Sequence, residues 1–316
     1  MQHVPLAYVV RSGFAEGTHY GCAVVLDSTR NPIVQAGDIK APVFLRSAAK
    51  PLQVVAMMEA GLSLREPHLV ALATGSHSGE AMHIDGVKEI LTKAQLDESS
   101  LENTVDYPLS ADERFKWEQT GRKPSHLAQN CSGQHAAMLL CCVQVGWNIA
   151  SYWDYKHPLQ KVTVEIVEEL AGEKIAAVGI DGCGLPTFGV SLHGLACAFS
   201  RLAMSNGPGA EYRVATAIRT CPEWMAGPTR KVTRLVQGVK GLIAKEGAEG
   251  VFAASLPNGV SLAVKISDGN VRALWPVVAA LFREVEVDAP ILEELSIVPI
   301  IGHGHQVGQI QVPRLR

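Results

Sequence analysis

The order of strand-like and helix-like segments restricts the fold of this chain more than any single motif. Short apolar runs rich in β-branched residues predict strands. They gather towards the two ends of the chain, at 6–11, 21–27, 33–36, 241–244, 250–255 and 260–266. Segments with helical periodicity fill the middle and follow the last of these strands, at 47–60, 66–73, 81–94, 133–145, 159–171, 192–203, 210–220 and 271–283.

Two turn signals indicate how neighbouring strands connect. The motif STRNP lies between the second and third strands and LPNG between the last two, so each pair reads as a hairpin. The two strand groups can then join one antiparallel sheet, with the helical middle as an inserted layer. We predict an α+β fold in one two-part domain over 1–316, with the sheet from about 1–46 and 240–316 and a helix-rich part over about 47–239.

Composition and charge exclude several classes of protein. Hydrophobic residues make up 47% of the chain and charged residues 19%, as in ordinary globular proteins. The formal net charge is −3 and no block of like charge occurs, so we expect neither a nucleic-acid nor a membrane partner. No apolar run reaches the roughly 18 residues that span a bilayer, and the first residues lack a signal-peptide pattern. The seven cysteines, an odd number, then favour a reduced, cytoplasmic protein.

The sequence RSAAKP at 46–51 can place a hydroxyl and an amine on one helical face. Ser47 and Lys50 are three residues apart, and such residues are neighbours on a helix. A buried lysine can lose its proton near neutral pH and then act as the base for a nucleophilic serine. About one such pair is expected by chance in a chain of this composition. The alternative is a helix-capping serine followed by a surface lysine.

Two other polar loops suit chemistry or simple turns. TGSHSGE at 74–80 predicts a tight loop with exposed hydroxyls, and a helix-connecting turn explains it about as well. KEGAEG at 245–250 is similar to the K-T-G element of serine acylases, in which a lysine on a strand edge lies beside the substrate. A charged β-turn is the alternative for this segment.

Two loops place a thiol beside glycine and polar side chains. They are NCSGQH at 130–135 and DGCGLP at 181–186. Cys131, Cys183 and His135 could ligate zinc, because thiolate and imidazole are its usual ligands. The spacing is weaker evidence than a C-x-x-C pair, and on sequence alone buried thiols without a metal explain these loops better.

Together these motifs resemble the bacterial asparaginase II family of Rhizobium type. The resemblance spans nearly the whole chain and is carried, in the right order, by VRSGF at 10–14 with Glu16 and His19, RSAAKPLQ at 46–53, SHSGE at 76–80, NCSG at 130–133 with His135, DGCG at 181–184 with Pro186, and Lys245 with GAEG at 247–250. It implies a fold related to the serine β-lactamases and Ser/Lys-dependent glutaminases. It also implies a homodimer that hydrolyses L-asparagine to L-aspartate and ammonia.

The resemblance implies two Ser–Lys pairs in the pocket, Ser47 with Lys50 and Ser78 with Lys245. We expect Ser47 to attack the side-chain carboxamide after Lys50 accepts its proton. Backbone N–H groups at the helix start would hold the oxyanion, and the second pair would relay a proton to the departing ammonia. The motifs do not decide which serine is the nucleophile.

Four further residues are expected to bind the substrate. Arg46 or Arg230 would clamp the carboxylate of asparagine, since a guanidinium matches it in a bidentate way. Asp181 would take the ammonium group. Asn130 is the fourth residue that we expect to bind the substrate.

The resemblance also implies a zinc ion near the pocket, with ligands from Cys131 and Cys183. The family motif carries a lysine that is itself a metal ligand, and Gln134 stands at that position here. A neutral amide oxygen should hold zinc less well than a neutral amine. We therefore expect zinc binding to be weak or absent.

Two other functions agree with the same residues. A glutaminase, peptidase or β-lactamase-like acylase would keep the Ser–Lys chemistry, because an apolar pocket discriminates one methylene only weakly. A protein that binds an amino acid or a metal without turnover is the other, and Gln134 favours it. The four intact residues of the two Ser–Lys pairs argue against it.

Overall fold

The computed structural model describes residues 2–315, and its main sheet draws strands from both ends of the chain. The sheet has eight antiparallel strands: seven follow the order β10-β11-β1-β2-β9-β8-β7, and the eighth, β3, pairs with β2 beside this path. Their bounds are β1 (Val4–Arg11), β2 (Phe14–Leu26), β3 (Pro32–Ala36), β7 (Ile243–Gly247), β8 (Val251–Ser255), β9 (Ser261–Ile266), β10 (Pro299–Gly302) and β11 (His305–Gln311). The prediction that the two strand groups form one sheet is confirmed.

The middle of this sheet is buried on both faces. Every residue of β2 from Gly21 to Leu26 is buried, although successive side chains of a strand point to opposite faces. Two helices, α7 (Leu192–Met204) and α11 (Val271–Glu284), pack against the central strands. Apolar residues on both faces of the strand explain why its sequence shows a continuous apolar run instead of an alternating one.

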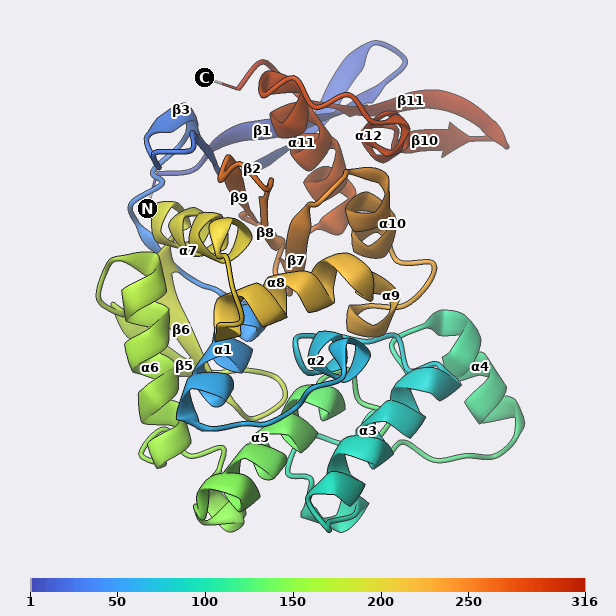
Figure 1. The fold of residues 1–316 in the computed structure, drawn as a ribbon. Coiled ribbons are helices and arrows are strands. Elements are labelled where there is room, and N and C mark those ends of the chain that lie inside the picture. Colours follow the sequence, from blue (N-terminus) through green and yellow to red (C-terminus); the bar gives the residue numbers. More distant parts are fainter. Residues whose placement is uncertain (1, 316) are drawn as a thin grey trace.

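The helical part lies at one end of the molecule and the sheet at the other (Figure 1). Helix α12 (Pro290–Ser296) packs on α11. The helical part contains α1 (Lys50–Ala60), α2 (Pro67–Ala73), α3 (Ala81–Lys93), α4 (Ala111–Gln119), α5 (Ser132–Val145), α6 (Pro158–Ala171), α8 (Ala210–Thr220), α9 (Pro222–Met225) and α10 (Lys231–Gly238). Helix α1 contacts α5, α6 and α8, and the turn before it, Arg46–Ala49, contacts β7 and β8, so the start of α1 lies between the two parts.

A second, three-stranded sheet occupies a region that we predicted to be helical or looped. It has the order β4-β6-β5, from β4 (Pro42–Phe44), β6 (Pro186–Ser191) and β5 (Ala177–Ile180). Strand β5 is short and mostly exposed, so it lacks the apolar pattern that identifies a strand. Helix α4 was missed for a similar reason, because Trp117 is its one buried residue.

Two boundaries differ from the prediction at the places that matter for chemistry. The segment Arg46–Ala49 is a 3-10 turn, and the α-helix begins at Lys50 because Pro51 fits the first helical turn. Strand β7 continues through Lys245 to Gly247, where we expected a turn. Lys245 therefore lies within β7, an edge strand of the main sheet. Figure 1 shows β7 at the side of the sheet that faces α8 and α10. Within residues 2–315, none of the helices is long and apolar enough to cross a membrane.

Candidate active site

The 3-10 turn that carries Ser47 is pressed against the edge strand of the sheet. A Cβ added at Gly247 would lie 3.0 Å from the carbonyl oxygen of Leu45 and 3.4 Å from the backbone nitrogen of Ser47. A larger residue would therefore push the strand away from the turn. Glycine at this position lets β7 and the start of α1 meet, so that Lys245 and Lys50 reach the same region.

Ser47 and Lys50 line one narrow pocket, as the spacing predicts. Ser47 is half-buried, whereas Lys50 is 2% exposed and its Nζ donates to the carbonyl oxygen of Gly75 at 2.5 Å. The pocket is nearly filled by its own side chains, with a free volume of about 10 Å³. Its other polar walls are Arg46, Gln53, Gln134, Asp181, Cys183 and Thr187. Hydroxyl, amine and charged groups thus share one small space.

Lys245 is fully buried and bonds to a different serine from the one we expected. Its Nζ lies 3.3 Å from the hydroxyl of Ser76 and also donates to the carbonyl oxygen of Glu246. Burial, together with the positive charges of Lys50 and Arg230, lowers the pKa of Lys245 to about 7, against the opposing effect of the Glu246 carboxylate. The amine can therefore gain or lose a proton near neutral pH.

Ser78 is held by a backbone carbonyl group from outside its own loop. Its hydroxyl donates to the carbonyl oxygen of Ala226 at 2.5 Å. The expected Ser78–Lys245 hydrogen bond does not occur among residues 2–315, because Ser76 occupies that place. The motif S-H-S contains both hydroxyls, and sequence alone could not show which of them faces the sheet.

Arg46 and Asp181 bind each other inside the pocket. Nε and Nη2 of Arg46 lie 2.9 and 2.7 Å from Oδ1 of Asp181, and Nη1 lies 4.0 Å from the carboxylate of Glu249. The Asp181 carboxylate raises the pKa of Arg46 above its ordinary value. Arg46 has a φ of 51°, a strained backbone conformation for a non-glycine residue, and such strain is common at functional sites. A cation and an anion side by side complement the two charges of an amino acid.

The other two expected substrate ligands are also bonded within the protein. Arg230 precedes α10 and forms an ion pair with Glu246, the neighbour of Lys245 on β7. The Asn130 side-chain oxygen accepts from the Cys131 thiol at 3.0 Å, and its carbonyl accepts from the His77 N–H at 3.0 Å. The charge of Arg230 therefore lies close to Lys245 and lowers its pKa, and Asn130 holds the Cys131 thiol in position.

Cys131 and Cys183 are buried beside each other and beside Lys50. The hydrogen bond from the Cys183 thiol outweighs burial and, with the charge of Lys50, lowers the pKa of Cys131 to about 5. Gln134 is turned away from this pair, because its Nε2 donates to Oε1 of Gln53 at 2.6 Å.

These residues do not fit a complete zinc site. A structural zinc ion takes four donors, and the pocket offers two thiols and an amide that is already bonded. In the described part of the chain, no group of three His, Cys, Asp or Glu residues is placed to hold a metal ion. Zinc therefore stays a prediction from the resemblance.

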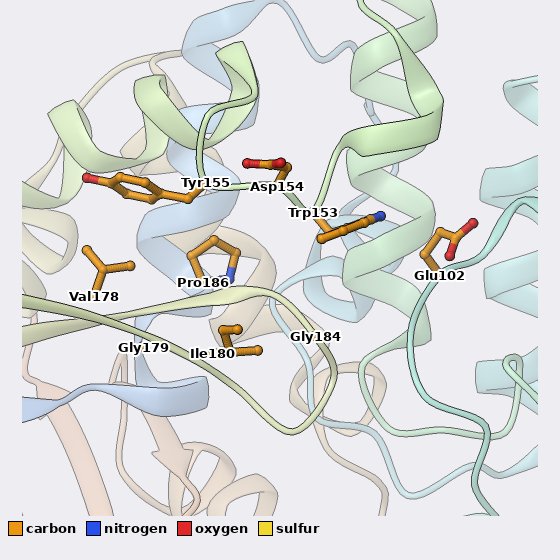
Figure 2. A pocket seen from close by; sticks show the side chains of 9 residues that line it. All are labelled: Glu102, Trp153, Asp154, Tyr155, Val178, Gly179, Ile180, Gly184 and Pro186. Atoms are coloured by element: carbon orange, nitrogen blue, oxygen red, sulfur yellow. The ribbon is translucent and has the colours of Figure 1, made fainter.

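A larger, mainly apolar hollow adjoins the polar pocket. It measures about 710 Å³, and Figure 2 shows two aromatic side chains on one side of it and the hairpin of β5 and β6 on the other. Its lining residues are Glu102, Trp153, Asp154, Tyr155, Val178, Gly179, Ile180, Gly184 and Pro186. Pro186 also lines the polar pocket, so the hairpin forms a wall between the two cavities.

The fold of this chain is similar to solved structures that include a β-lactamase and a glutaminase. A β-lactamase from Mycobacterium bovis is 16% identical, with a TM-score of 0.47 over 84% of this chain and 95% of that chain. The protein Mglu in its glutamate form is 17% identical, with a TM-score of 0.48 over 87% of this chain and 62% of that chain. A Bacillus glutaminase is 14% identical, with a TM-score of 0.46 over 84% of this chain and 91% of that chain.

The family is shown by sequence. No curated protein matches the chain. The sequence profile of the L-asparaginase II family matches residues 7–312, which include Lys50, Lys245 and all the serines discussed above. The chain therefore belongs to the L-asparaginase II family and is an amidohydrolase.

Proposed function

We propose that this protein hydrolyses L-asparagine to L-aspartate and ammonia through an acyl-enzyme formed on Ser47. The observation that carries the proposal is that Ser47, Lys50 and the Arg46–Asp181 ion pair line the same pocket. A nucleophile, an amine and a pair of opposite charges are what a small zwitterionic amide requires. Membership of the L-asparaginase II family supports the choice of asparagine.

We expect substrate binding to separate the Arg46–Asp181 ion pair. The pocket is nearly filled, so the head group of asparagine must displace part of the Arg46–Asp181 contact as it enters. Its carboxylate then takes the guanidinium, and its ammonium takes the carboxylate of Asp181. The ion pair keeps both side chains oriented until this exchange, which lowers the ordering cost of binding.

Acylation breaks the amide bond of the side chain. The Ser47 oxygen bonds to the carboxamide carbon, and its proton passes to Nζ of Lys50 in the neutral amine form of that side chain. Backbone N–H groups of the 3-10 turn hold the negative oxygen of the tetrahedral intermediate. The carbon–nitrogen bond then breaks, and the nitrogen takes the hydroxyl proton of Ser78 and leaves as ammonia.

Deacylation uses the second lysine. Water attacks the ester carbon, and the neutral amine of Lys245 takes the water proton through the Ser76 hydroxyl. The bond between Ser47 and the carbon breaks, Lys50 returns its proton to Ser47, and aspartate leaves. Lys245 then gives its extra proton to solvent and Ser78 regains one from solvent, so that each group ends as it began. The pKa of Lys245 of about 7 makes its neutral form available at physiological pH.

Ammonia release from purified protein tests this function. We expect release with L-asparagine by the wild type and by Ser28→Ala, which changes an exposed serine, but not by Ser47→Ala. Parallel assays with L-glutamine measure how well the enzyme distinguishes two substrates that differ by one methylene group. Assays after treatment with a chelator show whether ammonia release needs zinc. Absence of release from either amide under all these conditions would contradict the proposal. The homodimer implied by the resemblance is a separate proposal, which light scattering tests.

A further inference from the structure

Two glutamines line the polar pocket, and the proposed mechanism gives them no part. Gln53 is 4% exposed and Gln134 is 1% exposed. Nε2 of Gln134 donates to Oε1 of Gln53 at 2.6 Å, which joins α1 to α5 where these two helices pack together. A buried amide is costly unless its polar atoms are hydrogen-bonded. We therefore expect each nitrogen and oxygen of the pair to have a partner.

The single hydrogen bond between the glutamines leaves one nitrogen and one oxygen unused. Within residues 2–315, Nε2 of Gln53 and Oε1 of Gln134 have no hydrogen-bond partner, and neither atom is completely shielded from solvent. Both residues line the pocket, so these two atoms can reach its free space. If both amides are turned over, one nitrogen and one oxygen again stay unpaired. The pair therefore offers one donor and one acceptor in either orientation.

The helices place this donor and acceptor beside the nucleophile. Ser47, Lys50 and Gln53 follow one another at a spacing of three residues, so they share one face of the turn and of α1. Side chains of a helix tilt towards its N-terminus, so the long Gln53 side chain extends towards Lys50. Gln134 reaches the same pocket from the first turn of α5. The free volume of about 10 Å³ admits a group about the size of one water molecule.

A primary carboxamide is the small group that matches this donor and acceptor. It carries an acceptor oxygen and an NH2 donor side by side. The free nitrogen of the pair can donate to the carboxamide oxygen, which has a second lone pair for the backbone N–H groups of the turn. The free oxygen of the pair can accept from the NH2 group. A carboxylate or an ester has no N–H group and would leave that oxygen unpaired, which is costly in a buried site.

We propose that Gln53 and Gln134 form a clamp that binds the side-chain carboxamide of the substrate and makes the pocket specific for primary amides. The inference rests on the proposed function, because it places the carboxamide beside Ser47. A lysine at position 134, as in the family motif, would remove one of the two amides, so the clamp is a feature of this chain. The Arg46–Asp181 pair binds the charged end of the substrate, and the two glutamines bind the amide end.

Ligand titrations test the clamp without turnover. NMR titrations of Ser47→Ala give Kd values for L-asparagine and for L-2-aminobutyrate, in which a methyl group replaces the carboxamide. Adding Gln134→Met or Gln53→Met should weaken asparagine about fivefold, as loss of one neutral hydrogen bond implies, and change 2-aminobutyrate less than about twofold. Gln119→Met, at the exposed end of α4, should change neither. An equal loss for both ligands would overturn the clamp, because it would show a packing role only.

Steady-state kinetics with L-asparagine provide a second test. The clamp holds the carboxamide in the ground state and in the transition state alike, so Gln134→Met and Gln53→Met should raise KM about fivefold and change kcat less than about twofold. A large fall in kcat at constant KM would overturn the clamp. A wild type that releases no ammonia would instead contradict the proposed function, and the titrations of Ser47→Ala would still decide whether the glutamines bind the carboxamide.

Discussion

The two buried lysines of the candidate site, Lys50 in the pocket and Lys245 on the adjoining strand, have different surroundings. Lys50 lies in the first turn of α1, three residues from its serine, beside a Cys131 thiol whose pKa is lowered to about 5. Lys245 lies on the edge strand of the sheet, and its serine comes from a loop far away in the sequence. Burial lowers the pKa of Lys245 to about 7. Lys50 therefore has a fixed local geometry beside a thiol of lowered pKa, whereas Lys245 can gain or lose its proton as the pH changes near neutrality.

This difference suggests a division of labour. The Ser47–Lys50 turn forms and breaks the acyl bond, while Lys245 and Ser76 handle the proton of water. Variants of Lys50 and variants of Lys245 should therefore slow different steps of the reaction, and not only slow it by different amounts.

The largest effect is expected from Ser47→Ala. Without the hydroxyl no acyl-enzyme can form, and we expect kcat for asparagine to fall by at least about 10³-fold, as for other nucleophile deletions. Steady-state ammonia release measures this, with Ser28→Ala as the matched control. Near wild-type turnover by Ser47→Ala would remove the proposed nucleophile.

Lys245→Met should reduce kcat about 100-fold and abolish its pH dependence near neutrality. In the wild type, kcat should rise as pH increases through about 7, because the neutral amine accepts the proton. A pH–rate profile of both proteins, with the exposed Lys123→Met as control, measures this. A rise through pH 7 that survives in Lys245→Met would assign it to another group.

The same lysine should make folding stability depend on pH. Its folded pKa of about 7 lies below its ordinary 10.5, so between these values the unfolded chain binds a proton that the folded chain does not. The free energy of unfolding should therefore rise with pH in this window and be at its lowest below about pH 7. Denaturant titrations of the wild type and Lys245→Met measure the difference, and equal pH slopes would show that Lys245 is not desolvated.

Asp181→Asn should act on binding more than on chemistry. The change removes the anion for the substrate ammonium and loosens Arg46, so we expect KM to rise about tenfold while kcat falls less, as loss of one charged hydrogen bond implies. The exposed Asp288→Asn is the control. A large loss in kcat at constant KM would place Asp181 in the chemical step.

The smallest catalytic effect is expected from Gln134→Lys, which tests whether Gln134 weakens zinc binding. The change breaks the bond to Gln53 and offers an amine beside the two thiols, so we expect zinc affinity to rise at least about tenfold. Calorimetric titration with zinc compares it with the wild type, and Gln144→Lys at the far end of α5 controls for added charge. Equal zinc affinity would show that Gln134 does not decide metal binding.

Local patterns predicted one half of the site, and long-range packing determined the other. The i, i+3 spacing was enough to bring Ser47 and Lys50 to one pocket, because a single turn sets their distance. The choice of Ser76 over Ser78 depends on how β7 approaches a loop, and no periodicity records that. The pairing of Arg46 with Asp181 arises from the β5–β6 hairpin, whose short exposed strand gave no apolar signal.

The site of acylation tests the central claim most directly. The purified enzyme, mixed with excess L-asparagine and quenched in acid during turnover, should carry one aspartyl group on the peptide that contains Ser47. The modification should be absent from Ser47→Ala and retained in Lys245→Met, which we expect to slow its removal. An aspartyl group on Ser76 or Ser78 instead would contradict the assignment of the nucleophile and the division of labour between the two lysines.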